Sequence, residues 1–143
     1  MATQEQGKEI SQKFKTGFVE FLGEEGFKVI HDEWDGESAT WDVYFKQEGK
    51  TLMAVFDADD PYFIRLILPN FYSLDDPKEQ ASALLHTQEA NRTCKGAKVY
   101  MNSAKNDVVA TCEFLATDGT INYDRYLSML NNVSRAFVSL MRG

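Results

Sequence analysis

The hydrophobic period of the chain changes twice, and this change constrains the fold more than any other feature of the sequence. In residues 5–22 the apolar side chains recur at spacings of three and four, which predicts an amphipathic helix. From residue 27 to residue 68 the period becomes two, which is typical of half-buried β-strands. In residues 121–141 the apolar side chains return to helical spacing and cover one broad face. The pattern therefore predicts a block of strands between helices.

The middle block divides into four predicted strands, at residues 27–33, 39–47, 51–56 and 62–68. Short links with turn-forming residues join them, so the strands should form an antiparallel meander. Pro69 should end the fourth strand, because proline cannot donate a hydrogen bond to a sheet ladder.

A second helix is predicted to begin at Pro77, since Asp76 can cap it and Glu79 completes a capping-box-like pair. It should run to about residue 94. Its apolar stripe is thin, and consists of Ala81, Leu84 and Leu85. Two further strands are predicted at residues 98–102 and 108–115.

The resulting order is α-ββββ-α-ββ-α, which predicts an α+β fold with helices packed on an antiparallel-rich sheet. With 143 residues, three prolines and no shift in composition, we expect a single domain over residues 1–143. The side chains that we expect to be buried between helices and sheet are Phe14, Phe18, Leu127, Leu130 and Phe137.

Composition and charge narrow the class of function. The net charge is −7, and an acidic chain repels phosphate, so binding to nucleic acid or to an anionic membrane is disfavoured. No apolar run approaches the roughly 20 residues of a membrane helix, and the first residues lack the apolar core of a signal peptide. Two cysteines make neither a disulfide framework nor a zinc site. We therefore expect a cytoplasmic protein without a cofactor.

Motifs of catalysis are missing from the sequence. It contains no nucleophile elbow, phosphate-binding loop, dinucleotide fingerprint or zinc-protease pattern. His31 and His86 each lack a second ligand at helical spacing, and we interpret them as surface histidines. Cys112 alternates with apolar neighbours and is interpreted as a small core residue. The prediction is a protein that is not an enzyme.

An alternative function rests on acidic turns. Asp35 lies in the first turn of the meander, and the third turn carries Asp57, Asp59 and Asp60. Both turns fall at the same end of the sheet, roughly 10 Å apart. Clustered carboxylates could bind Ca²⁺ or Mg²⁺, or serve an enzyme in which His31 acts as a base. Acids at turns are otherwise simply solvated, and both interpretations stay open at this point.

Apolar residues occur on both faces of the predicted sheet. By the parity of each strand, one face carries Tyr44, Met53, Val55, Phe63 and Ile67 together with Arg65. If the helices cover the other face, this one stays exposed, and exposed apolar surface usually marks an interface. An arginine is costly in a sealed core unless it pairs with Asp57 or a neighbouring acid, in which case protein could cover both faces. We predict that this face binds an unidentified protein partner or a second copy of the chain.

The second predicted helix supplies another surface. Because its apolar stripe is thin, we expect a core to bury Leu84, Leu85 and Gln88 only in part. Because two-fold pairing is the commonest form of assembly, we predict that this helix contributes to a homodimer.

The C-terminal half resembles the YbjN-like family. The matching features are the segment of residues 90–101, the strand of residues 108–115 and the closing apolar helix, with the family's positions held by Asn91, Gly96, Glu113, Leu127 and Leu130. The N-terminal half is similar in pattern rather than in motif. The resemblance implies a fold like that of type III secretion chaperones and an interaction protein, often dimeric, labelled as a bacterial sensory transduction regulator. A dedicated type III effector chaperone, which is also small, acidic and dimeric, is a further interpretation.

Overall fold

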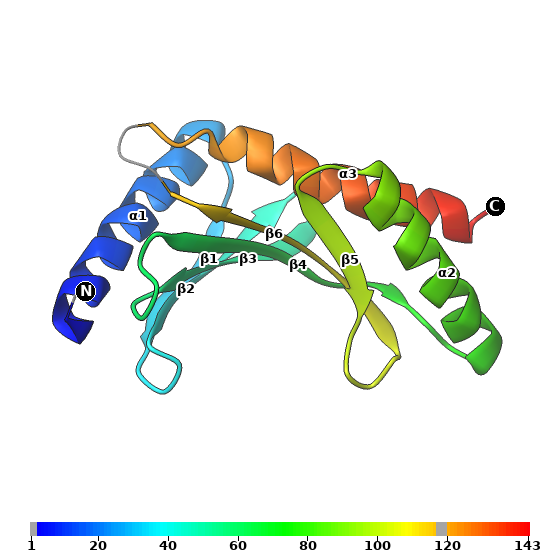
Figure 1. The fold of residues 1–143 in the computed structure, drawn as a ribbon. Coiled ribbons are helices and arrows are strands. Elements are labelled where there is room, and N and C mark those ends of the chain that lie inside the picture. The colour runs from blue at the N-terminus through cyan, green and yellow to red at the C-terminus, as the bar shows by residue number, and fades with distance from the viewer. Residues whose placement is uncertain (1–2, 117–119) are drawn as a thin grey trace. The chain divides into compact units, whose positions relative to one another are not determined.

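The computed structural model describes residues 3–116 and 120–143, and the order of elements in these residues is the predicted α-ββββ-α-ββ-α. The strands form a six-stranded antiparallel sheet in the order β1-β2-β3-β4-β6-β5, which confirms the predicted α+β class. The elements, shown in Figure 1, are α1 (Gln4–Glu25), β1 (Val29–Asp35), β2 (Thr40–Gln47), β3 (Lys50–Asp57), β4 (Phe63–Ser73), α2 (Pro77–Thr93), β5 (Ala97–Met101), β6 (Asp107–Leu115) and α3 (Tyr123–Met141).

Contacts along the chain define two compact units. The first consists of Met1–Leu66 and Glu113–Tyr123, and the second of Ile67–Cys112 and Asp124–Gly143. Strands β4 and β6 each contribute residues to both units. The single domain expected from the sequence stays a prediction.

Helix α1 of the first unit has defined ends. Thr3 caps its start through a capping box with Gln6, and Gly26 ends it in the left-handed conformation with φ of 77°. The helix lies against β2 and β3. Near its start a Cβ on Gly7 would lie 2.0 Å from the carbonyl oxygen of Ala58, so only glycine permits this close approach.

The core of the first unit is aromatic. The ring of Phe18, which is fully buried, lies 5.4 Å from that of Phe45, 5.8 Å from that of Phe56 and 5.0 Å from that of Tyr123. Phe18 is therefore buried as predicted. The expected burial of Phe14 is wrong, because this residue is only half-buried.

Helix α3 supplies the large apolar side chains of the second unit. Leu127, Leu130 and Phe137 are at most 1% exposed, as predicted. The Phe137 ring meets Phe71 and Tyr72 edge-on, at 5.9 and 5.5 Å between centroids.

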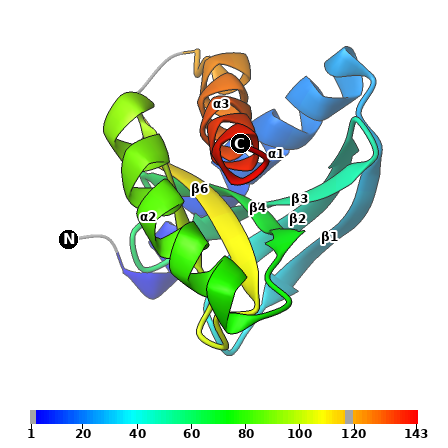
Figure 2. The ribbon, with the colours of Figure 1, turned by 90° about the vertical axis from the view of Figure 1, so that its right-hand side faces the viewer.

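Helix α2 lies beside β5 (Figure 2) and buries a different stripe from the one predicted. Its buried residues are Ala83, Thr87 and Ala90, whereas Ala81, Leu84 and Leu85 are exposed. Small side chains allow the helix to approach the strand closely. The Asn91 side chain then bonds both backbone groups of Val99, accepting from its N–H at 2.7 Å and donating to its C=O at 3.0 Å. The exposure of Leu84 and Leu85 agrees with the incomplete burial expected of them, whereas the packing stripe of small residues was not predicted.

The predicted end of the fourth strand at Pro69 is also wrong, because β4 continues to Ser73. After the proline, Asn70 adopts a left-handed conformation with φ of 49°. The Tyr72 N–H then donates to the Asp107 carboxylate at 3.1 Å, and the Leu74 N–H donates to the Asn106 carbonyl at 2.9 Å. The single donor that proline lacks does not end the strand, because the residues beyond it have partners at the start of β6.

Candidate functional site

The face of β2, β3 and β4 that α1 does not cover is the first candidate, and we call it the open face. Its side chains in the first unit are half-buried: Tyr44, Met53, Val55 and Phe63. Tyr44 is the register partner of Met53 across the β2–β3 pair. On the face under α1, by contrast, Val43, Phe45 and Leu52 are at most 1% exposed. The predicted division of the strands into two faces is thus present, and the predicted binding by this face stays a prediction.

Arg65 lies on the same face and pairs with Glu113 of β6. Its Nε is 3.3 Å from Oε1 of Glu113, and the two side chains are 45% and 29% exposed. The partner is therefore a neighbouring acid rather than Asp57. An ion pair this exposed contributes little to stability. Ile67, also half-buried, follows two residues later on β4 and has the same strand parity.

The predicted dimer residues of α2 are accessible. Leu84 is 52% exposed and Leu85 is 67% exposed, and Gln88 is exposed as well. These three residues lie outside the buried stripe of the helix, which consists of Ala83, Thr87 and Ala90. The dimer itself stays a prediction.

The carboxylates of Asp35 and Asp57 accept hydrogen bonds from backbone N–H groups of their own turns. One oxygen of Asp35 accepts hydrogen bonds from the N–H groups of Glu37 and Ser38, at 3.0 and 3.3 Å. The Ser38 side chain and these N–H groups hold the pKa of Asp35 below its ordinary value. Asp57 likewise accepts from the N–H of Asp59 at 2.9 Å.

The proposed cation site at Asp35, Asp57, Asp59 and Asp60 is not assembled in the part of the chain that the structure describes. There, no group of three His, Cys, Asp or Glu side chains is placed to hold a metal ion.

His31 and Glu33 form a pair that the sequence analysis did not identify. Nε2 of His31 lies 3.1 Å from Oε2 of Glu33, and the imidazole lies edge-on to Tyr44 at 5.7 Å. Two residues apart on a strand, they share a face, so strand parity could have revealed the pair. Beside them, burial raises the pKa of Asp42, against a hydrogen bond of 2.9 Å from the Thr40 hydroxyl that lowers it.

The remaining candidates from the sequence, His86, Cys94 and Cys112, belong to the second unit. His86, on α2, is half-buried. Cys112 is 1% exposed, as expected of a core residue, and Cys94 is half-buried with its sulfur 3.9 Å from the Asn132 carbonyl oxygen.

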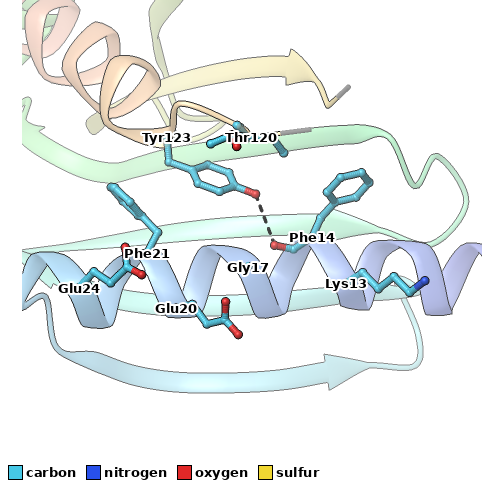
Figure 3. A pocket seen from close by; sticks show the side chains of 9 residues that line it. Lys13, Phe14, Gly17, Glu20, Phe21, Glu24, Thr120 and Tyr123 are labelled. Atoms are coloured by element: carbon cyan, nitrogen blue, oxygen red, sulfur yellow. Dashed lines mark hydrogen bonds between the residues drawn. The ribbon is translucent and has the colours of Figure 1, made fainter. Parts of the chain in front are cut away.

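A cleft beside Gly17 was missed by the sequence analysis, and we call it the Gly17 cleft. It has a volume of about 450 Å³ and lies between α1 and the residues that lead into α3 (Figure 3). Its lining comes from segments about a hundred residues apart, which explains why no local pattern revealed it. The lining residues are Lys13, Phe14, Gly17, Glu20, Phe21, Glu24, Thr120, Ile121 and Tyr123.

Tyr123 forms the wall of this cleft opposite the helix. Its side chain is almost fully buried, and its hydroxyl donates a hydrogen bond to the Phe14 carbonyl oxygen at 3.4 Å. Burial raises the pKa of Tyr123, so the phenol keeps its proton. Its ring also packs on Phe18 and Phe21, at 5.0 and 5.6 Å between centroids. The wall is thus held from several sides.

Gly17 forms the helix side of the cleft. A Cβ there would meet no atom within 4 Å, so no packing contact requires glycine at this position. Within a helix, glycine is less favourable than alanine by about 1 kcal/mol. This contrasts with Gly7, where a Cβ would clash with Ala58. Gly17 therefore costs helix stability without relieving a clash, and it lines the cleft.

The charges around the cleft are unequal at its two ends. Lys13 and Glu24 lie at opposite ends, separated by eleven residues or roughly 16 Å of helix. Glu20 and Glu24 lie toward the C-terminus of α1, whose last turn contains no basic residue. The helix dipole places partial negative charge at that end, which is unfavourable for the carboxylate of Glu24 in the last turn.

Comparisons with known proteins bear on the fold alone. A scan against family models and a search of curated proteins found no match. Among solved structures, the chain is similar to an uncharacterized protein from Methanothermobacter thermautotrophicus, with 23% sequence identity and a TM-score of 0.59. The similarity covers 92% of this chain and 94% of that one. In the described residues, none of the helices has the length and apolar character needed to cross a membrane.

Proposed function

We propose that this protein is a cytoplasmic, non-enzymatic interaction module of the YbjN-like type, with a chaperone-like or regulatory role. Its site is the open face, and its ligand is an apolar segment of a partner protein. The observation that carries the proposal is the half-buried apolar group of Tyr44, Met53, Val55 and Phe63 opposite a sealed core face.

The composition of the open face supports this choice of ligand. Aromatic residues, methionine and arginine are the types enriched at protein interfaces, and the face contains all three. The charge of Arg65 is paired with that of Glu113 on the same face, so this arginine need not select an acidic ligand. Apolar side chains of a partner would displace water from the half-buried rings and gain from that burial.

Site-specific photo-crosslinking in the native organism tests the proposal. A benzophenone amino acid replaces Tyr44 on the open face, and in a control replaces the exposed Ser103 in the turn before β6. We expect one partner to be crosslinked from position 44 and not from position 103. A peptide covering the crosslinked segment should then bind the untagged protein, and Phe63→Ser should weaken that binding at least about tenfold.

Two results would contradict the proposal. One is equal crosslinking from positions 44 and 103. The other is unchanged peptide affinity in Phe63→Ser while urea unfolding shows the variant to be folded. The titration is followed by calorimetry rather than by tryptophan fluorescence, because Trp34 and Trp41 lie on the neighbouring strands β1 and β2.

Self-association through α2 is a second proposal, which the exposure of Leu84 and Leu85 favours. Sedimentation of the untagged protein at micromolar concentration should give a dimer, and Leu85→Glu should give a monomer. A wild-type monomer would exclude this dimer, and a dimer that persists in Leu85→Glu would exclude the role of α2.

A further inference from the structure

We infer that the Gly17 cleft is a binding site for a small organic cation with an aromatic or aliphatic body. The site belongs to the first unit and uses none of the open-face residues, so the inference is independent of the proposed function.

The shape of the cleft supports a ligand rather than an accident of packing. A volume of about 450 Å³ falls within the range of small-molecule sites. Phe14, Phe21 and Tyr123 supply an apolar lining, and a long hydrogen bond from Tyr123 to the Phe14 carbonyl, at 3.4 Å, joins the two walls. Gly17 keeps the helix side clear although nothing in the protein requires the missing side chain.

The charges select a cation. Glu20 and Glu24 both line the cleft, and Glu24 lies in the last turn of α1, so a bound positive charge there is favoured by the two carboxylates and by the negative end of the helix dipole. The faces of aromatic rings attract cations in addition. Lys13 lies at the far end, so the charged group of the ligand should be directed toward Glu24 and its apolar body toward Phe14 and Tyr123.

Three probes of nearly the same shape test the sign of charge. They are 2-phenylethylammonium, 2-phenylethanol and 3-phenylpropanoate, each titrated into the protein at low salt while amide shifts are followed by NMR. We expect saturable shifts at Gly17, Phe21 and Tyr123 with the ammonium probe. Its Kd should be on the order of fivefold lower than that of the alcohol, as expected for an exposed ion pair with the carboxylates of Glu20 and Glu24. The carboxylate probe should bind most weakly.

Two variants locate the site. Gly17→Leu should fill the cleft and raise the Kd of the ammonium probe at least about tenfold. The matched control is Gly23→Leu, in the same helix, where a Cβ also meets no atom within 4 Å but which does not line the cleft. This control should keep the wild-type affinity, and both variants are checked for folding by their amide spectra.

A second variant tests charge without changing shape. The double substitution Glu20→Gln and Glu24→Gln should bring the ammonium affinity down to that of the alcohol. The inference is overturned if the three probes bind equally, if Gly17→Leu and Gly23→Leu have the same effect, or if the double glutamine variant retains the preference for the cation.

Discussion

The two faces of β2 and β3 are both apolar, yet only one is sealed. Phe45 and Leu52 lie under α1 and are at most 1% exposed, whereas Tyr44 and Met53, one residue along each strand, remain half-buried. The difference comes from what packs on each face. On one side Phe18 inserts its ring against the strands. Apolar composition alone therefore does not decide burial, and the covering element does.

Phe45→Ala should produce the largest loss, because it removes a fully buried ring beneath Phe18. We expect a decrease of about 3–5 kcal/mol in the free energy of unfolding. Urea unfolding followed by circular dichroism gives the value. Tyr44→Ala on the same strand is the control for the open face, and equal losses for the two would mean that the faces do not differ.

Phe63→Ser should cost less, because the ring is only half-buried on the open face. We expect a loss of about 1 kcal/mol, near the centre of the distribution for single substitutions. The same urea experiment measures it. A loss as large as that of Phe45→Ala would place Phe63 in a core and remove the proposed partner surface.

The assignment of side chains to the two faces of the sheet could be predicted from the sequence. How the helices pack was less predictable. Period-two parity assigned the side chains of β2, β3 and β4 correctly, since geometry alone determines it. The packing of α2 was not predictable from apolar periodicity, because Ala83, Thr87 and Ala90 bury little area and match no large-residue stripe. The continuation of β4 past Pro69 depends on partners at residues 106 and 107, far along the chain.

The candidate sites also differ in how far the sequence predicts them. Residues of the open face follow from strand parity. The Gly17 cleft needs Tyr123 to be placed against α1, which is a tertiary contact over more than a hundred residues. Gly17 in a predicted helix costs helix stability, but Gly7 in the same helix does so too, so a helical glycine alone does not indicate a cleft.

Gly17→Ala tests α1, the helix that covers one face of β2 and β3 and leaves the other face open. Because a Cβ there meets open space, the variant should be more stable by about 0.5–1 kcal/mol. Gly7→Ala should change stability in the opposite direction, since its Cβ would clash with the Ala58 carbonyl. Thermal unfolding of both variants checks the pair of signs. Destabilisation by Gly17→Ala would show that the helix needs glycine there for its own packing.

Asp42→Asn should give the smallest effect, and its sign depends on pH. Burial raises the pKa of Asp42 in the folded protein, so folding favours the protonated acid. The stabilisation by that proton is complete below the ordinary value of 3.8 and is lost as the pH rises through the folded pKa. At pH 7 the wild type therefore holds an unfavourable charge that asparagine lacks, while the asparagine oxygen can still accept from the Thr40 hydroxyl.

Asp42→Asn should thus be slightly more stable than the wild type at pH 7. Since the site is partly exposed, solvent screening keeps the gain within about 0.5 kcal/mol. The gain should shrink as the pH falls below the folded pKa, because the wild-type acid then becomes neutral as well. Thermal unfolding of the two proteins side by side from pH 7 to pH 3 measures the difference. A variant that is less stable at pH 7 would mean that the charge on Asp42 favours folding, with the hydrogen bond from the Thr40 hydroxyl outweighing the cost of burial.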